Sequence, residues 1–443
     1  MDIDALKQAA IDAYMRSNGW SVDSSYTMIG VGYSARVEKD GTGQESDSNG
    51  WLTEIDLTDE FAQIRTRVDD ALKPWQEDRM PDPAELNGGM VKAQEALTAL
   101  NIGDGTSLAG ALGGYFETVR NNAKDFHGAA MDAFNNSFVS QLPAVINNHG
   151  CLAAIVTEAW AAEKQIWTDA RTDRDKVVED STTALHDYSR TSSSAGLDFV
   201  LALAGAAISG ASAVASAGVT LPYSIASATI TAISATTDLA EAFEVERQGD
   251  SYDKLMEAFE GGLDDIDAAI TKQETLVMEA LNTAWKVFED NRPLFDLTPR
   301  VSDNGDGVFD DSDASLFDVA DASGLEIVLP GQPVIDSLSS GLINLASGLD
   351  QADPKITAGA DDGGLLSSSA REVGLRSGGV TTFMGILGYN NSISIRDLAW
   401  DVRQGNAMLL AVIQDFQNAD ADSQAALDQL RGALVGGSGE DAW

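Results

Sequence analysis

The stretch CLAAIVTEAWAAEKQIWTDARTDRDKVV, residues 151–178, decides the fold class. It is rich in alanine, glutamate, lysine and arginine, which favour a helix. Helical spacing surrounds it over residues 85–190 and returns over residues 240–291, whereas few segments look like strands. The sequence therefore predicts a mainly α fold, in which long antiparallel helices form a bundle.

Changes of composition divide the chain into five segments. The bundle is predicted over residues 85–292, with a kink or break at Pro143, and it follows a mixed region in which YTMIGVGYSARV (26–37) favours a hairpin. After the bundle we expect a linker and then a subdomain of short helices separated by Gly and Ser. The remaining boundaries are 1–84 for the mixed N-terminal region, 293–334 for the linker, 335–434 for the C-terminal helical subdomain and 435–443 for a flexible tail.

The charge of the chain excludes one class of partner. It has 28 Lys and Arg against 70 Asp and Glu, a formal net charge of −42. A surface this negative repels the phosphates of nucleic acids and anionic lipids. Divalent cations and cationic proteins remain as partners. Because hydrophobic residues make up 44% of the chain, we expect a packed core and not a disordered polyanion.

Residues 199–237 contain no charged side chain. Gly218 and Pro222 divide this segment into two halves, each dominated by small residues that favour close contact between helices. One interpretation is a buried apolar helical hairpin inside the bundle. The alternative is a concealed hairpin that inserts into membranes, as in helical pore-forming toxins.

The stretch SDNGDGVFDDSDASLF, residues 302–317, has the spacing of a calcium loop. An EF-hand loop takes oxygen ligands from positions 1, 3, 5, 9 and 12, a backbone carbonyl at 7, and glycine at 6. With Gly307 at position 6, the ligands fall on Ser302, Asn304, Asp306, Val308, Asp310 and Asp313. Hard oxygen ligands at these spacings suit calcium. The simpler alternative is a solvated acidic linker.

This loop closely resembles the calcium loop of dockerin modules, in which Asp at position 12 is normal. Ser302 at position 1 departs from the pattern, and Asp303 is the neighbouring acid that could replace it. The resemblance covers one loop, whereas dockerins carry two, so it implies no cohesin-binding module. It implies a structural calcium ion that clamps the turn between the 240–291 helix and the C-terminal part.

A second motif, FHGAAMDAF, occupies residues 126–134. An aromatic residue, a glycine two positions later and small residues beyond it suit a tight turn between closely packed helices. The motif resembles the W-x-G helical hairpin of type VII (ESX) secretion substrates, with Phe126 in place of Trp and Gly128 at the glycine position. The resemblance extends over residues 85–190. It implies export, with a small W-x-G-type helical protein or the secretion machinery as partner.

Substrates of that system carry Tyr-x-x-x-Asp/Glu after a helical hairpin, and the chain has no such spacing. The nearest match is Phe416 with Asp420, on the final predicted helix; the alternative is that Phe416 belongs to the core and Asp420 to a solvated face. The start of the chain, MDIDALKQAAIDAY, lacks the features of a cleaved secretory signal. We therefore expect a secreted or cell-surface protein without a cleaved signal peptide, or alternatively a cytoplasmic one.

No motif points to catalysis. The three histidines, His127, His149 and His186, show no metal-ligand or Ser-His-Asp spacing, and no P-loop or dinucleotide fingerprint is present. The lone cysteine, Cys151, stands in an apolar context typical of a buried small residue. We expect a non-enzymatic protein that acts through protein–protein interaction, with membrane action only under the toxin alternative.

Overall fold

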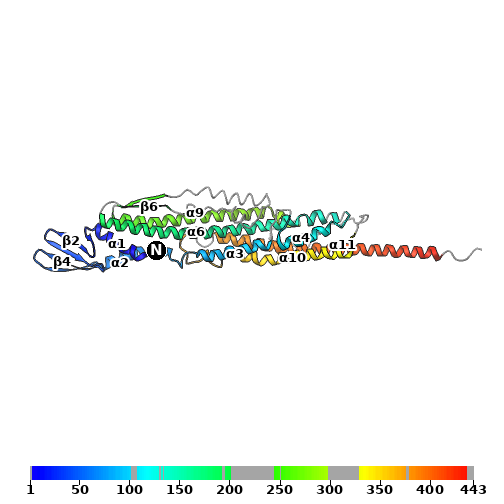
Figure 1. The fold of residues 1–443 in the computed structure, drawn as a ribbon, viewed down its shortest axis with the longest axis horizontal. Helices are drawn as coiled ribbons and strands as arrows, with labels where there is room; N and C mark the ends of the chain where they lie inside the picture. Colours follow the sequence, from blue (N-terminus) through cyan, green and yellow to red (C-terminus); the bar gives the residue numbers. More distant parts are fainter. Residues whose placement is uncertain are drawn as a thin grey trace, which may run out of the picture.

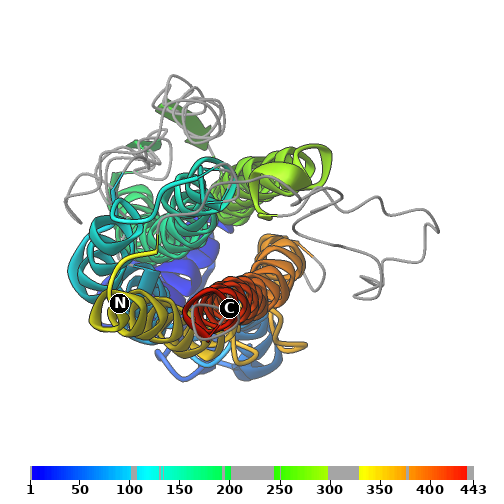
Figure 2. The ribbon, with the colours of Figure 1, turned by 90° about the vertical axis from the view of Figure 1, so that its right-hand side faces the viewer.

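A computed structural model describes residues 2–100, 107–128, 131–132, 134–191, 195–200, 244–249, 251–297, 329–375 and 379–436. The molecule is a long helical bundle with a small sheet at one end (Figure 1). Seen from the opposite end, the helices lie around a common long axis (Figure 2). The predicted mainly α fold with a mixed N-terminal region is confirmed.

The N-terminal region combines two helices with an antiparallel sheet. Tyr26 pairs with Val37 across the hairpin predicted over residues 26–37, and the strands follow one another in chain order across the sheet. The elements are α1 (Ile3–Ser17), β1 (Ser21–Val22), β2 (Tyr26–Gly30), β3 (Tyr33–Val37), β4 (Thr42–Asp47), β5 (Leu52–Asp56), α2 (Thr58–Leu72) and the 3₁₀ turn η1 (Lys73–Trp75).

Two long helices, α6 (Leu142–Thr191) and α9 (Tyr252–Asp290), run antiparallel through the bundle. At one end, Ser17 lies 3.0 Å from the Tyr188 hydroxyl of α6 and accepts a hydrogen bond from the Tyr252 amide that begins α9. At the other end, His149 near the start of α6 contacts the Phe295 carbonyl, just beyond the end of α9. Helix α6 begins at Leu142, so Pro143 lies in its first turn, where proline is tolerated.

The helix predicted over residues 240–291 is too long at its start. Residues Glu244–Gly249 form strand β7, which pairs antiparallel with β6 (Ala195–Val200), and α9 begins only at Tyr252. Ser251 caps α9 by accepting a hydrogen bond from the Lys254 amide. Pairing with β6, far away in sequence, gives 244–249 a strand partner that helical spacing did not reveal.

The other helices in the described part of the chain are α3 (Pro83–Leu100), α4 (Gly110–Ala123), the π-helix η2 (Phe134–Val139), the 3₁₀ turn η5 (Arg292–Leu294), α10 (Gln332–Ala360) and α11 (Val380–Gly436). The prediction of several short C-terminal helices is wrong, because α10 and α11 are both long. The ion pairs Asp350–Arg403 and Asp353–Arg396 show that these two helices pack antiparallel.

Glycines within α10 mark contacts and not helix ends. A Cβ atom at Gly341 would lie 2.9 Å from Val119 of α4, and one at Gly359 would lie 2.7 Å from the Ala93 Cα of α3. The Gly359 carbonyl also accepts a 2.8 Å hydrogen bond from the Trp160 indole of α6. Glycine therefore lets α10 approach α4 and α3 closely, and the Gly359 carbonyl connects α10 to α6.

Two buried apolar clusters share α6. The first joins α1, the sheet and α2 to α9, to most of α6 and to the start of α11. The second joins α4, the turn at Phe126 and the start of α6 to α10 and the rest of α11. The first core therefore crosses both segment boundaries expected at residues 84 and 335, and the second crosses the one at 335.

Candidate functional site

A cleft of about 900 Å³ lies between α2 and α9, beside the chain that leads from α10 to α11. Its lining includes Trp75 and Val373, and Arg67 is its basic residue. Six acidic residues also line it: Asp59, Asp70, Glu260, Asp264, Asp267 and Glu372. Such a cleft attracts cations and repels anions.

The basic residue of the cleft is already paired. Arg67 on α2 donates to both carboxylate oxygens of Glu260 on α9, at 2.6 and 3.0 Å, and it lies 3.8 Å from Asp253. The hydrogen bond to Glu260 raises the pKa of Arg67 above its usual value. This two-pronged pair fixes α2 against α9 and leaves the net charge of the cleft negative.

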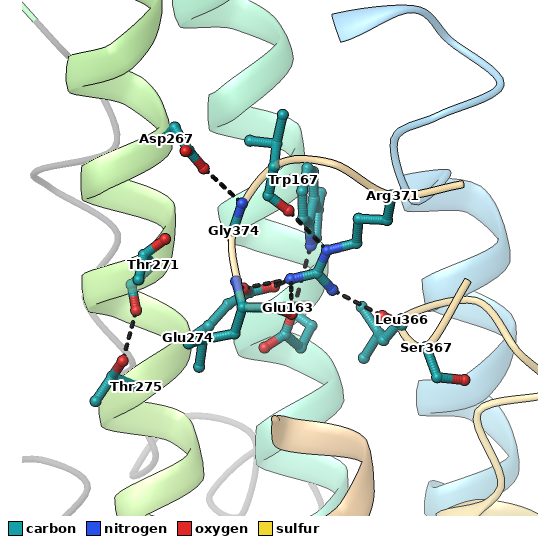
Figure 3. A network of polar contacts seen from close by, with 12 residues as sticks. Glu163, Trp167, Asp267, Thr271, Glu274, Thr275, Leu366, Ser367, Arg371 and Gly374 are labelled. Atoms are coloured by element: carbon teal, nitrogen blue, oxygen red, sulfur yellow. Dashed lines mark hydrogen bonds and ion pairs between the residues drawn. The ribbon is translucent and has the colours of Figure 1, made fainter. Parts of the chain in front are cut away.

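Behind the cleft, Arg371 holds the α10–α11 connection to the bundle (Figure 3). Its guanidinium pairs with Glu274 of α9 and lies 4.9 Å from the ring centre of Trp167 of α6. It also donates to the carbonyls of Leu366 and Val373, each at 2.9 Å. The connection is thereby folded around its own arginine.

Gly374 completes this attachment. Its amide donates to Asp267, a cleft residue, at 2.6 Å, and its φ of 74° lies in the left-handed region. A Cβ at this position would lie 2.6 Å from Glu274 Oε2. Glycine is therefore required both for the backbone conformation and for the close approach to the carboxylate.

Glu163 of α6 places a second carboxyl group beside this ion pair. Glu163 is 0% and Glu274 is 1% exposed. Burial, followed by the charge of Glu274, raises the pKa of Glu163 well above its usual range. Burial also raises the pKa of Glu274 to about 7, although Arg371 opposes the rise. One guanidinium thus faces two carboxyl groups, and Glu163 is the one that is protonated.

A proton on Glu163 satisfies the local hydrogen bonding. The Trp167 indole donates to Glu163 Oε2 at 3.3 Å, whereas Oε1 has no donor partner. A protonated Glu163 becomes a donor to Glu274, the carboxylate that it contacts. The buried Arg371 cluster (Glu163, Glu274 and Arg371) is therefore a neutral acid, an anion and a cation.

This cluster is suited to holding the α10–α11 connection and not to catalysis. Its three side chains are almost fully buried, so a substrate could not reach either carboxyl group. The adjoining cleft is open but contains neither histidine nor a nucleophilic cysteine or serine among its lining residues. What the arrangement offers chemically is a negative surface held in place by a rigid support.

Sequence reasoning did not find the cluster, although one signal was present. Glu163 follows Trp160 by three positions and precedes Trp167 by four, and Glu274 follows Ile270 by four positions and precedes Val277 by three. Both acids therefore occupy positions on apolar helix stripes, where a charge needs a partner. Nothing in the spacing identified Arg371 as that partner.

The predicted calcium ligands Ser302, Asn304, Asp306, Val308, Asp310 and Asp313 lie outside the described residues. The part of the chain that is described contains no group of three or more His, Cys, Asp or Glu side chains placed to hold a metal ion. The calcium loop therefore stays a prediction.

The predicted turn at Phe126 and Gly128 is described. Phe126 is 1% exposed and belongs to the second core, and the neighbouring His127 is exposed. Gly128 has a φ of 119°, and its carbonyl accepts a 2.8 Å hydrogen bond from the Asp132 amide. The aromatic residue is thus buried and the glycine takes a conformation that other residues avoid.

The helices on either side of this turn do not form an isolated pair. Helix α4, which ends at Ala123, packs chiefly against α10. Beyond the turn, Phe134 and Phe138 stack with ring centres 5.2 Å apart, and Phe138 lies where a Cβ on Gly405 of α11 would be. The turn is therefore built into the larger bundle.

The proposed export pair lies on α11. Phe416 is half-buried, and Asp420 follows it one turn later on the same helix. The end of α11 extends past the other helices (Figure 1). Leu427, on this extension, is exposed.

Two residues singled out in the sequence are structural. His149 is buried, with its ring nitrogens 2.7 Å from the Asn391 side chain and 2.9 Å from the Phe295 carbonyl, and burial lowers its pKa. Cys151 is buried and free, and burial raises its pKa to about 12. A thiol with that pKa is not a nucleophile at neutral pH.

The uncharged segment 199–237 lies outside the described residues, except that Phe199 and Val200 end strand β6. Among the helices that are described, none is both long and apolar enough to cross a bilayer.

Comparisons of the chain with protein-family models, with curated proteins and with solved structures gave no match.

Proposed function

We propose that this chain is a non-enzymatic helical protein, exported through a type VII-like secretion system, that acts by binding another protein. The observation that carries the proposal is the turn at Phe126 and Gly128. A buried aromatic side chain followed by a glycine at positive φ is what a W-x-G-like turn requires. The packing of α4 against α10 departs from a free helical hairpin, so under this proposal the turn is built into a larger bundle.

The chemistry of the described residues supports binding over catalysis. Its most strongly perturbed carboxyl groups, Glu163 and Glu274, are buried, and its open cleft is acidic. An acidic surface selects cationic partners and speeds their encounter, an effect that salt weakens.

Export is tested by fractionating cultures of the organism that encodes the chain. We expect the protein in the medium or at the cell surface, and at least tenfold less of it there when the secretion ATPase is deleted. The double variant Phe416→Ala, Asp420→Ala should stay inside the cell while its melting temperature is unchanged. Asp415→Ala with Asn418→Ala, two exposed positions on the same helix, is the matched control and should be exported normally.

Finding the wild-type protein only in the cytoplasm, with or without the ATPase, would contradict the export half of the proposal. Equal export of the two double variants would show that Phe416 and Asp420 are not the export signal. The turn at Phe126 and Gly128 would then be the feature that the secretion system recognises. The turn is then tested separately with Gly128→Ala.

A further inference from the structure

One edge of the N-terminal sheet is open. The strands are ordered β1 to β5, so β1 and β5 form the two edges. Strand β1 has only two residues, whereas β5 has five and is exposed along most of its length. Within the described part of the chain, β4 is the principal neighbour of β5. The sheet lies at the far end of the molecule from the extension of α11 (Figure 1).

The hydrogen bonds of β4 show which backbone groups of β5 are free. The Asp47 amide donates to the Trp51 carbonyl at 3.1 Å, and the Leu57 amide donates to the Gly41 carbonyl at 2.8 Å. Because bonded residues alternate along an antiparallel strand, the odd-numbered residues between Trp51 and Leu57 face β4. The backbone groups of Leu52 and Glu54 therefore point to the open edge.

Large apolar side chains accompany this edge. Trp51 is 75% exposed and Leu52 is 66% exposed. The Asp47 carboxylate holds the turn before them by accepting 2.8 Å hydrogen bonds from the amides of Asn49 and Trp51. An edge that is only protected from aggregation carries charges and few apolar groups. Exposed Trp and Leu on an ordered turn instead mark a contact surface.

The charges of the edge select its occupant. Glu54 and Asp56 are exposed on β5, and Glu45 stands on the neighbouring strand. The register that pairs all of β5 with a second copy would place Glu54 opposite Glu54, and like charges directly opposite destabilise a sheet. An acidic edge on a chain of net charge −42 also repels anionic lipids. A cationic strand is the complement.

We propose that the open edge of β5 binds an extended, cationic segment of another protein, which joins the sheet as an additional strand. Backbone hydrogen bonds to Leu52 and Glu54 supply affinity, and basic side chains opposite Glu54 and Asp56 supply selectivity. This inference deepens the binding half of the proposed function and does not depend on export.

The test uses the full chain and three synthetic peptides at 0.15 M NaCl. TKVKTKVT can form a strand with its lysines on one face; TKPKTKPT has the same charge but cannot form a strand; TEVETEVT has the opposite charge. We expect calorimetry to show binding of the first peptide at least tenfold tighter than of the other two. Hydrogen–deuterium exchange should show new protection over residues 52–56.

Two variants separate the backbone from the charge. Glu54→Pro removes an amide that points to the open edge, so the sheet should keep its melting temperature while peptide binding weakens at least tenfold. Glu54→Gln keeps the amide and should weaken binding threefold or less. Both measurements are independent of where the cell places the protein.

Several results would overturn the inference. These are equal binding of TKVKTKVT and TKPKTKPT, protection confined to the α2–α9 cleft, or undiminished binding by Glu54→Pro. A dimer in sedimentation that Glu54→Pro abolishes would assign the edge to a second copy. Binding of phosphatidylcholine vesicles through Trp51 would assign it to a membrane surface.

Discussion

At the scale of single residues, the Arg371 cluster contains the two described carboxyl groups whose pKa values are most strongly raised. Two buried carboxyl groups share one guanidinium, so the cluster is electrically neutral only when one carboxyl group is protonated. The raised pKa values of Glu163 and Glu274 mean that the folded state binds protons that the unfolded state has already released. This difference makes the free energy of unfolding depend on pH.

We predict that this cluster makes the free energy of unfolding fall as pH rises. An unfolded glutamate titrates near 4.5, and Glu274 in the folded protein titrates at about 7. Between these values folding takes up protons, so the contribution of Glu274 is full below pH about 4.5 and is lost as pH rises through about 7. The pKa of Glu163 is also raised, so its contribution falls with rising pH in the same sense. Glu163→Gln keeps a neutral hydrogen-bond donor. From pH 5 to pH 8, its free energy of unfolding should fall by on the order of 2 kcal/mol less than that of the wild type. Urea unfolding at both pH values measures this.

Glu274→Gln is the informative comparison. It leaves the Arg371 charge buried without its anion, which typically costs about 3–5 kcal/mol. Glu163→Gln should lower the free energy of unfolding at pH 8 by much less than Glu274→Gln does. Parallel pH profiles for the wild type and Glu163→Gln would show that Glu163 does not hold the proton.

Gly128 gives a second prediction at this scale. Its φ of 119° is unfavourable for any residue with a Cβ, so Gly128→Ala should lower the free energy of unfolding by about 1–2 kcal/mol. Gly114→Ala is the control, because that glycine lies in α4 with nothing within 4 Å of an added Cβ. The control should be neutral or stabilising by about 0.5–1 kcal/mol. Equal effects of the two variants in urea unfolding would mean that the turn is not strained by a side chain.

At the scale of elements, helical spacing predicted the long helices well where their apolar faces are continuous. It failed in α10 and α11, because glycines such as Gly341 of α10 and Gly405 of α11 look like helix breakers in the sequence but serve as contact points against Val119 and Phe138. Strand β7 was missed for a related reason, since its partner β6 lies far away in the chain. Local patterns report local preferences, and these features depend on distant contacts.

The candidate site was less accessible to prediction for the same reason. Arg371 meets Glu274 across 97 positions of sequence, and Arg67 meets Glu260 across 193. In a chain with 70 acidic residues, no spacing rule singles out the few that are buried. The turn motif at Phe126 and Gly128 was visible in the sequence because its residues lie two positions apart, whereas its role in export stays a prediction.

The calcium loop gives the prediction that belongs to this scale. Calcium at a hundredfold excess over Kd should stabilise the fold by about 2.7 kcal/mol if it binds the native state alone. Asp306→Ala removes a ligand at the centre of the 302–313 loop and should abolish most of that gain. Magnesium should replace calcium poorly, because it requires a tighter octahedral site.

Melting curves in calcium, magnesium and chelator measure this stabilisation. Asp303→Ala serves as the comparison for Asp306→Ala: a small loss places Ser302 at the first ligand position, and a large loss shows that Asp303 replaces it. Identical melting temperatures in calcium and chelator would show that calcium does not stabilise the fold through this loop, and would favour the acidic linker interpretation.

At the scale of the whole molecule, the chain has a net charge of −42, and its described residues form a long, narrow bundle (Figure 1). Several basic residues are committed to specific partners, such as Arg67 to Glu260, Arg371 to Glu274 and Arg403 to Asp350. With 28 basic residues against 70 acidic ones, the negative charges of the chain outnumber the positive ones by 42. Self-repulsion of such an excess opposes the compact state.

We therefore predict that salt stabilises this protein. The Debye length falls from about 10 Å at 0.1 M to about 3 Å at 1 M, so repulsion between surface carboxylates is screened while buried pairs such as Arg371–Glu274 are little affected. The melting temperature should rise steadily between 0.05 and 1 M NaCl. The variant Asp70→Asn, Asp264→Asn removes two charges from the cleft and should be more stable at low salt, with a smaller response to added NaCl. Its matched control, Asp4→Asn with Glu54→Gln, removes two charges outside the cleft and should change the response less. A melting temperature that is flat or falls with NaCl would show that surface ion pairs, and not repulsion among the carboxylates, dominate the electrostatics of the fold.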